Sequence, residues 1–209
     1  MVIEEITQTK NKPGWFTALF EDGTVIKVSV EQLADYGLYQ GLELPDDEYR
    51  RLRAELEFGA SKTRALRILG SRTYSSREIE RRLTNKGESR ETAARTVQWL
   101  EEIGAINDKE YAASIVEHYR SKGYGLAKIR EELFRRGIPG DIWDEAIGDF
   151  EIATDATLDF LMKKLSGSRE NSEQRVAINA LRARGFSYED AQEVWRKYME
   201  NTEEIENEQ

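Results

Sequence analysis

The first 30 residues carry short apolar runs separated by turn residues, a pattern typical of β-strands. The runs cover 2–7, 15–20 and 24–30. Asp22 and Gly23 lie between the last two runs, and because glycine adopts positive φ without steric cost, this pair predicts a hairpin. The segment 30–38 has the spacing of one short helix that a glycine ends. We therefore expect residues 1–45 to form a small antiparallel sheet with a helix.

From Pro45 onward the apolar positions follow the period of an α-helix. Asp46 and Asp47 favour a helix start, because carboxylates cap the first turn and complement its partial positive charge. The stretch 46–72 is compatible with one helix or with two, since Gly59 and the small residues after it mark a candidate break.

The rest of the chain contains one helical pattern three times. Gly87, Gly137 and Gly185 are 50 and 48 residues apart, and the segments around them share their chemistry at fixed offsets. Leucine stands four residues before each glycine, a basic residue directly before it, serine or proline two after it, and a bulky apolar residue ten after it. In that order the positions are Leu83, Leu133, Leu181; Lys86, Arg136, Arg184; Ser89, Pro139, Ser187; and Val97, Ile147, Trp195.

Each shared glycine is predicted to end one helix just before the next begins. Glycine in the left-handed conformation ends a helix, and the apolar residue after it, Ile138 or Phe186, packs back on the last turn. Glu88 takes this position in the first copy, so we expect the apolar contact to be lost there. Ser89 and Ser187 are placed to cap the following helices, and a further helix precedes each pair.

We therefore predict a mainly α fold: three tandem three-helix repeats that form an elongated array, preceded by a small N-terminal β segment. The expected divisions are 1–45 for the β segment with its short helix, 46–106 for a helical linker and repeat 1, 107–153 for repeat 2, 154–200 for repeat 3 and 201–209 for an acidic tail. The tail is expected to fray or to extend the last helix.

Composition excludes several classes of function. The chain has no cysteine and therefore no disulfide, thiolate metal site or cysteine nucleophile. The single histidine, His118, does not make an ordinary zinc site, and no glycine-rich phosphate loop is present, so we expect no cofactor. The N-terminus has no signal-peptide pattern, and no apolar run approaches the roughly 18 residues of a membrane span. We expect a cytoplasmic protein without membrane contact.

The net charge of −9 hides an uneven distribution. Residues 1–60 carry a net charge of −6, residues 61–140 of +6 and residues 141–209 of −9. A basic middle between acidic ends favours a local contact with phosphates or with an acidic protein surface.

Residues 99–138 resemble the RecX family, the regulatory proteins of the RecA recombinase. The resemblance covers roughly residues 60–200 and includes the threefold helical repeat. The matching residues are Leu100, Gly104, Ile106, Asp108, Tyr111, Ala112, Arg120, Gly125, Ile129, Leu133 and Gly137.

The resemblance implies a non-enzymatic protein that binds RecA along its filament on single-stranded DNA. Such a protein inhibits or modulates strand exchange, ATP hydrolysis and co-protease activity, and we expect it to be a monomer. Two alternatives stay open at the level of sequence. One is a helix-turn-helix DNA-binding protein such as a transcription factor, which the turn at Gly137 superficially suits. The other is a protein-interaction scaffold that contacts no nucleic acid.

The basic residues of the first two repeats are the candidate RecA- or DNA-binding residues. They are Arg72, Arg77, Arg81, Arg82, Lys86, Arg120, Lys122, Lys128, Arg130, Arg135 and Arg136. Arg77 and Arg81 are four apart and share a helix face that is able to meet phosphates. The competing interpretation is a solvated helix face, whose ion-pair partners are Glu78, Glu80, Glu131 and Glu132.

Aromatic residues of the repeats allow two interpretations. Tyr74 and Tyr124 occupy matching positions, five before Ile79 and Ile129, where either base stacking or core packing is compatible with the sequence. Core packing is the stronger expectation for both tyrosines and for Trp143.

Overall fold

The computed structural model describes residues 1–10, 12–165 and 173–207. The chain divides into two compact units, one of Met1–Ser71 with Arg82–Trp99 and the other of Arg72–Arg81 with Leu100–Gln209. The predicted mainly α fold with a small N-terminal sheet is confirmed. The divisions predicted within it remain predictions, and residues 166–172 of the third repeat and 208–209 of the tail lie outside the described residues.

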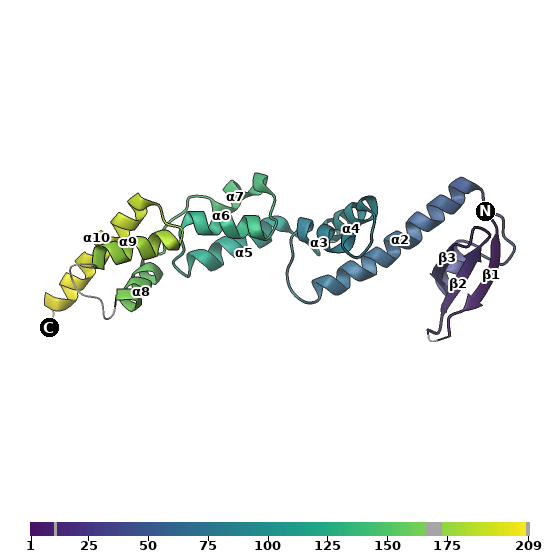
Figure 1. Cartoon of the computed structure of the whole chain (residues 1–209), viewed down its shortest axis with the longest axis horizontal. Coiled ribbons are helices and arrows are strands. Elements are labelled where there is room, and N and C mark those ends of the chain that lie inside the picture. Colours follow the sequence, from purple (N-terminus) through teal and green to yellow (C-terminus); the bar gives the residue numbers. More distant parts are fainter. Residues whose placement is uncertain (11, 166–172, 208–209) are drawn as a thin grey trace. The chain divides into compact units, whose positions relative to one another are not determined.

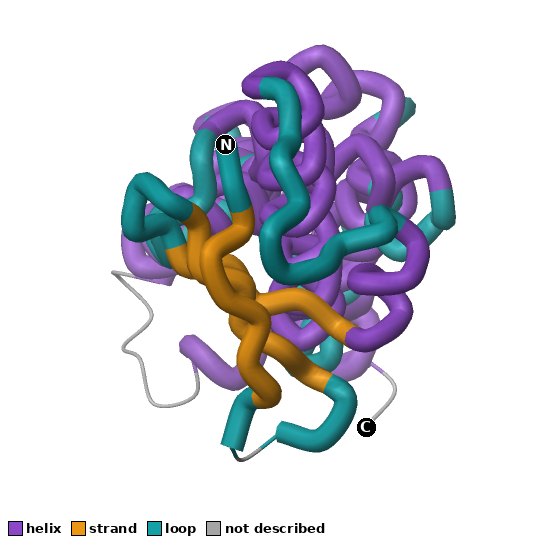
Figure 2. The backbone as a smooth tube through the Cα atoms, turned by 90° about the vertical axis from the view of Figure 1, so that its right-hand side faces the viewer, coloured by secondary structure: helices purple, strands orange, loops and turns teal. Residues whose placement is uncertain are grey.

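The first unit begins with an antiparallel sheet of three strands in the order β1-β2-β3, orange in Figure 2. The strands are β1 (Ile3–Gln8), β2 (Trp15–Phe20) and β3 (Val25–Ser29). The predicted hairpin turn joins β2 to β3, and Gly23 adopts a φ of +80° there. Helix α1 (Val30–Asp35) follows directly, with Ser29 as its capping residue.

The sheet and the first half of helix α2 (Asp46–Leu69) share one hydrophobic core. Phe20 and Val28 of the sheet are almost completely buried in it with Leu52 of α2. Helix α2 is a single helix of 24 residues, so the candidate break after Gly59 is absent.

Two further helices, α3 (Ser76–Thr84) and α4 (Arg90–Glu102), complete the first predicted repeat together with the second half of α2. The hydroxyl group of Thr96 in α4 lies 2.9 Å from that of Ser61 in α2, and both side chains are fully buried. Glu88 forms an ion pair with Arg64 of α2 and is 9% exposed. A charged contact thus stands where the other repeats have the predicted apolar one.

The second unit contains two helical groups that each bury a core of their own. The first group is α5 (Asp108–Arg120), α6 (Leu126–Arg135), the 3₁₀ turn η1 (Gly140–Ile142) and α7 (Trp143–Ile147). The second group is α8 (Thr154–Leu165), α9 (Glu173–Ala183) and α10 (Tyr188–Asn207). Figure 1 shows each group as a separate cluster of helices, in green and in yellow-green. Helix α10 extends into the predicted tail as far as Asn207.

The predicted ends of the helices are confirmed. Gly87, Gly137 and Gly185 have φ values of +95°, +69° and +90°. The N–H of Ile138 donates to the carbonyl oxygen of Leu133 at 3.0 Å, and Ile138 is 1% exposed. The next helices are capped where expected, because Thr92 N–H donates to Ser89 Oγ and Asp190 N–H donates to Ser187 Oγ.

The turns at Gly137 and Gly185 also bind the start of a helix from the preceding repeat. Gly125, which precedes α6, donates its N–H to the carbonyl oxygen of Arg184 at 3.0 Å, and Ala127 donates to that of Gly185 at 3.0 Å. A Cβ atom on Gly125 would collide with the backbone of Gly185 and Phe186. Only a glycine lets the two backbones approach so closely.

The corresponding joint between the first two repeats uses a serine. Ser75, directly before α3, donates its hydroxyl to the carbonyl oxygen of Arg136 at 2.7 Å. The hydroxyl oxygen of Ser75 also accepts the N–H of Glu78 at 3.2 Å, so one side chain caps α3 and binds the turn after α6.

Candidate nucleic-acid interface

The turn after α6 separates two pockets of different charge. Residues Phe134, Arg135 and Arg136 line the first pocket, and Pro139, Asp141 and Ile142 line the second. The bond from Ser75 to this turn brings the start of α3 against it, so α3 contributes side chains to both pockets.

The first pocket has a volume of about 280 Å³ and is predominantly basic. Its lining consists of Glu78, Arg81, Phe134, Arg135, Arg136 and Gly137. Helix α3 of the first repeat supplies Arg81, and the end of α6 in the second repeat supplies the other two arginines. The predicted residues Arg81, Arg135 and Arg136 are therefore brought together, although 54 residues separate Arg81 from Arg135 in the sequence.

Glu132 is a buried carboxylate that pairs with Arg135 and Arg136 of this pocket. Its side chain is 5% exposed and accepts hydrogen bonds from Nε and Nη2 of Arg135 at 3.1 and 2.5 Å. Burial alone would raise the pKa of Glu132, but the hydrogen bond from Arg135 and nearby positive charge outweigh burial and lower that pKa. The carboxylate is thus ionised and covered, while the side chain of Arg135 is 62% exposed.

Arg136 has a structural role that the sequence interpretation left open. Its Nη1 donates to the phenolic oxygen of Tyr111 at 2.7 Å, and the side chain is 28% exposed. The equivalent residue of the third repeat, Arg184, donates to the carbonyl oxygens of Lys122 and Gly123. In both repeats, arginine at this position links two elements by hydrogen bonds, and Arg136 also lines the pocket.

Phe134 is the functional candidate that sequence reasoning missed. It is 76% exposed, the largest value for any large hydrophobic side chain in the described ranges. A signal was present in the repeat alignment, because the position three before the glycine is polar in the other copies, Thr84 and Arg182.

The remaining basic residues of the first repeat do not share one environment. Arg72 donates to Glu78 at 2.7 Å and lies over the ring of Tyr74. Arg82 is half-buried, whereas Arg77 and Lys86 are exposed and have no ion pair with any residue that the structure describes. Arg72 thus has one of the expected ion-pair partners, whereas Arg77 is exposed and has none among the described residues.

In the second repeat, the basic residues outside the pocket are mostly ion-paired. Arg120 pairs with Glu117, Lys128 with Glu131, and Arg130 lies 3.7 Å from Asp144. Lys122 is exposed in the connection before α6 and, within the described residues, has no ion pair. None of these four basic residues lines the basic pocket.

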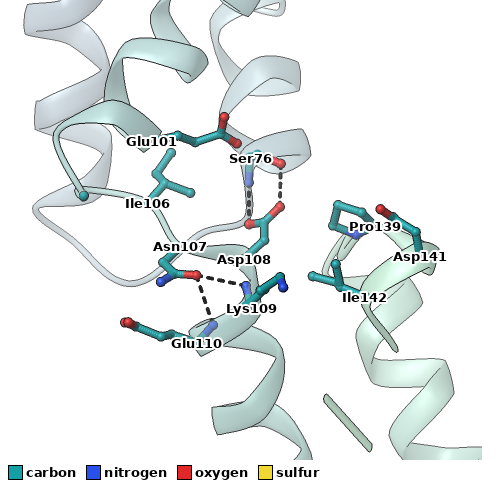
Figure 3. A pocket seen from close by; sticks show the side chains of 11 residues that line it. Ser76, Glu101, Ile106, Asn107, Asp108, Lys109, Glu110, Pro139, Asp141 and Ile142 are labelled. Carbon is teal, nitrogen blue, oxygen red and sulfur yellow. Dashed lines mark hydrogen bonds between the residues drawn. The ribbon is translucent and has the colours of Figure 1, made fainter. Parts of the chain in front are cut away.

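The second pocket, of about 490 Å³, is predominantly acidic (Figure 3). Asp108 lies at its centre and accepts hydrogen bonds from the backbone N–H and the hydroxyl group of Ser76 at 2.9 and 2.5 Å. Through these two hydrogen bonds, Asp108 connects the start of α3 to the start of α5. Burial and the charge of Asp108 raise the pKa of Glu101.

The aromatic residues Tyr74, Tyr124 and Trp143 are buried or half-buried. Tyr74 is 6% exposed, which confirms core packing, and Tyr124 is half-buried with the guanidinium of Arg184 over its ring. Trp143 packs against the core of the second repeat and donates to the carbonyl oxygen of Ile138 at 3.0 Å.

Within the described residues, no three His, Asp or Glu side chains gather so as to hold a metal ion. No described helix has the length and apolar character that crossing a membrane requires.

Two family models match the chain in consecutive segments. Residues 62–100 match RecX, first three-helix domain, and residues 107–147 match RecX, second three-helix domain. A solved structure described as the crystal structure of regulatory protein RecX covers 95% of this chain and 98% of its own, with a TM-score of 0.69 and 20% identity. The fold is therefore shared along almost the whole chain.

Curated relatives carry the same name. Regulatory protein RecX of Escherichia coli (strain K12) is 30% identical over 155 residues, which is 66% of this chain and 90% of the relative. The protein of that name from Xanthomonas campestris pv. campestris is 34% identical over 126 residues, 59% of this chain and 78% of the relative. The Bacillus subtilis protein is 28% identical over 193 residues, 90% and 73% of the two chains. Repeats, fold and relatives agree: the chain belongs to the RecX family of regulatory proteins.

Proposed function

We propose that this chain binds the RecA recombinase on its single-stranded DNA filament and so inhibits or modulates recombination, ATP hydrolysis and co-protease activity. It acts by binding rather than by catalysis, as a monomer in the cytoplasm. The regulatory name that its relatives share supports a role of this kind.

The observation that supports the proposal best is the basic pocket. Arg81 and Arg135 reach it from two successive repeats, so its charge exists only when the repeats are packed together. The charge of Glu132 is covered, whereas the paired guanidinium of Arg135 is exposed, so positive charge faces outward. Exposed guanidinium groups bind phosphates and carboxylates, both of which a nucleoprotein filament presents.

Binding of this kind predicts stoichiometric inhibition of the DNA-dependent ATPase of RecA. We expect the ATPase rate to fall in proportion to the amount of protein added, and the inhibition to weaken between ~50 and 200 mM salt. An unchanged rate at every ratio and salt concentration would remove the proposal.

Charge reversal locates the surface. Arg81→Glu changes the sign of one pocket residue and should raise the concentration needed for half-inhibition on the order of tenfold, through the loss of a phosphate or carboxylate contact. Arg196→Glu, an exposed arginine of α10 outside the pocket, is the matched control and should leave inhibition unchanged. Equal behaviour of the two variants would place the contact elsewhere.

A helix-turn-helix transcription factor has less support. A recognition helix lies in the major groove and presents several side chains to base edges. The helix after the turn at Gly137, α7, has only five residues, and the turn itself is engaged by Ser75.

A further inference from the structure

Phe134 has no role in the packing of the fold. It stands at the last full turn of α6, is 76% exposed, and no ring contact or cation contact of it is present among the described residues. The equivalent residues Thr84 and Arg182 are polar. The repeat architecture therefore does not require an aromatic ring at this position, and its hydration is unfavourable in the free protein.

The surroundings of the ring indicate its ligand. Phe134 lines the basic pocket with Arg81, Arg135 and Arg136, so an exposed aromatic ring and the exposed side chains of Arg81 and Arg135 share one cavity of about 280 Å³. Single-stranded nucleic acid presents the matching pair of groups, a base with a π face and a phosphate within one nucleotide. The carboxylates of an acidic protein segment would pair with the arginines but would offer no π face to stack on the ring of Phe134.

We propose that Phe134 stacks on a base of single-stranded DNA while Arg81 and Arg135 contact the adjoining phosphates. The proposal rests on the function proposed above and adds that the contact with DNA is direct. Stacking discriminates poorly between bases, because every base has a π face, so the site is expected to bind without strong sequence preference.

The test measures binding of the full chain to a short labelled oligothymidylate by fluorescence anisotropy, with RecA absent. Phe134→Ala should weaken binding roughly 5- to 150-fold, the range that loss of one stacked base produces. Phe134→Leu, which keeps an apolar side chain without the ring, should behave like the alanine variant, and Phe134→Tyr should bind like the original chain. Tyr39→Ala removes a ring that is 61% exposed elsewhere and should change nothing.

An abasic strand of the same length separates stacking from charge. It keeps the phosphates and lacks the bases, so Phe134→Ala should bind it as the original chain does. A similar loss on both strands, or no loss on oligothymidylate, overturns the proposal. If Phe134→Ala binds oligothymidylate normally but inhibits the ATPase of RecA poorly, the ring contacts protein instead.

The failure of this proposal differs from the failure of the proposed function. If the original chain inhibits the ATPase but does not bind oligothymidylate, direct stacking is refuted and the regulatory role stands. If the chain binds oligothymidylate through Phe134 but leaves the ATPase unchanged, the DNA site stands and the regulation of RecA is refuted.

Discussion

At the scale of single residues, Glu132 determines the electrostatics of the end of α6. The carboxylate is almost buried and lies within 4 Å of three cations, Lys128, Arg135 and Arg136. Burial would raise the pKa of Glu132, but hydrogen bonds from Arg135 and Tyr119 and the charges of Arg135 and Lys128 lower it, because they stabilise the ionised form. A group of this kind stabilises the folded chain only while it is charged.

The stability of the chain should therefore depend on pH through Glu132. Its pKa is lower in the folded than in the unfolded chain, so its contribution is complete above the unfolded value of about 4.3 and is lost as the pH falls through the folded value. At neutral pH, Glu132→Gln should lower the free energy of unfolding by about 1–3 kcal/mol. The difference should shrink below about pH 4, as thermal or urea unfolding across pH would show.

Glu131→Gln provides the control on the same helix. Glu131 also pairs with Lys128, but its side chain is 61% exposed, and exposed pairs contribute little. We expect only a small change at any pH. A difference between the original chain and Glu132→Gln that stays constant down to acid pH would contradict the assignment.

At the scale of elements, the turns at Gly137 and Gly185 each perform two tasks. All three turns end a helix through a left-handed glycine, and those at Gly137 and Gly185 also bind the start of a helix from the preceding repeat. At the joint between the second and third repeats the contact is backbone to backbone, because Gly125 donates its N–H to Arg184 and Ala127 donates its N–H to Gly185.

Gly125→Ala tests the joint. The added Cβ atom meets backbone rather than a flexible side chain, so α6 and the turn must separate, and we expect a loss of about 1–3 kcal/mol in urea unfolding. Gly140→Ala adds the same atom in open space and should change stability by no more than about 0.5 kcal/mol. Equal effects would mean that the close approach at Gly125 carries no energetic weight.

The sequence predicts what depends on local chemistry. The hairpin at Gly23, the helix ends at Gly137 and Gly185 and the cap at Ser187 follow from properties of one or two residues, and the structure has all of them. The short length of α7 was not predicted, although local residues account for it in the structure. Pro139 begins a 3₁₀ turn and Gly148, at a φ of +53°, ends the helix after five residues, where the other repeats have longer helices.

The candidate site was predictable only in part, because it depends on which surfaces meet. Arg81, Arg135 and Arg136 were expected, but nothing local shows that they share one pocket and that Arg120 and Lys122 do not. Exposure of Phe134 is likewise a consequence of packing between helices. Periodicity alone places an aromatic residue in a helix without saying which neighbours cover it.

At the scale of the whole molecule, stability is divided among separate cores. One core joins the sheet to α2 and includes Phe20 and Leu52, one belongs to α5–α7, and one belongs to α8–α10. In a chain built this way, each part opens largely according to its own core and its nearest neighbour.

Leu181→Ala should therefore destabilise one region selectively. Leu181 is fully buried in the core of α8–α10, and its truncation is expected to remove about 2–5 kcal/mol. Hydrogen exchange followed by mass spectrometry should show faster exchange in α8–α10, with the amides of β1–β3 unchanged. A uniform acceleration across the chain would indicate a single cooperative unit instead.

Because the turns at Gly137 and Gly185 both end a helix and bind the preceding repeat, few insertions or deletions are tolerated there. A residue inserted between Leu133 and Ile138 would displace the end of α6 and, through the bond from Ser75 to Arg136, the start of α3 as well. A compensating change would be needed in a different repeat, some 60 residues earlier in the chain. In repeats joined in this way, insertions and deletions are expected away from the joints. A duplicated repeat would carry a turn to which the start of a helix in the preceding repeat must bind.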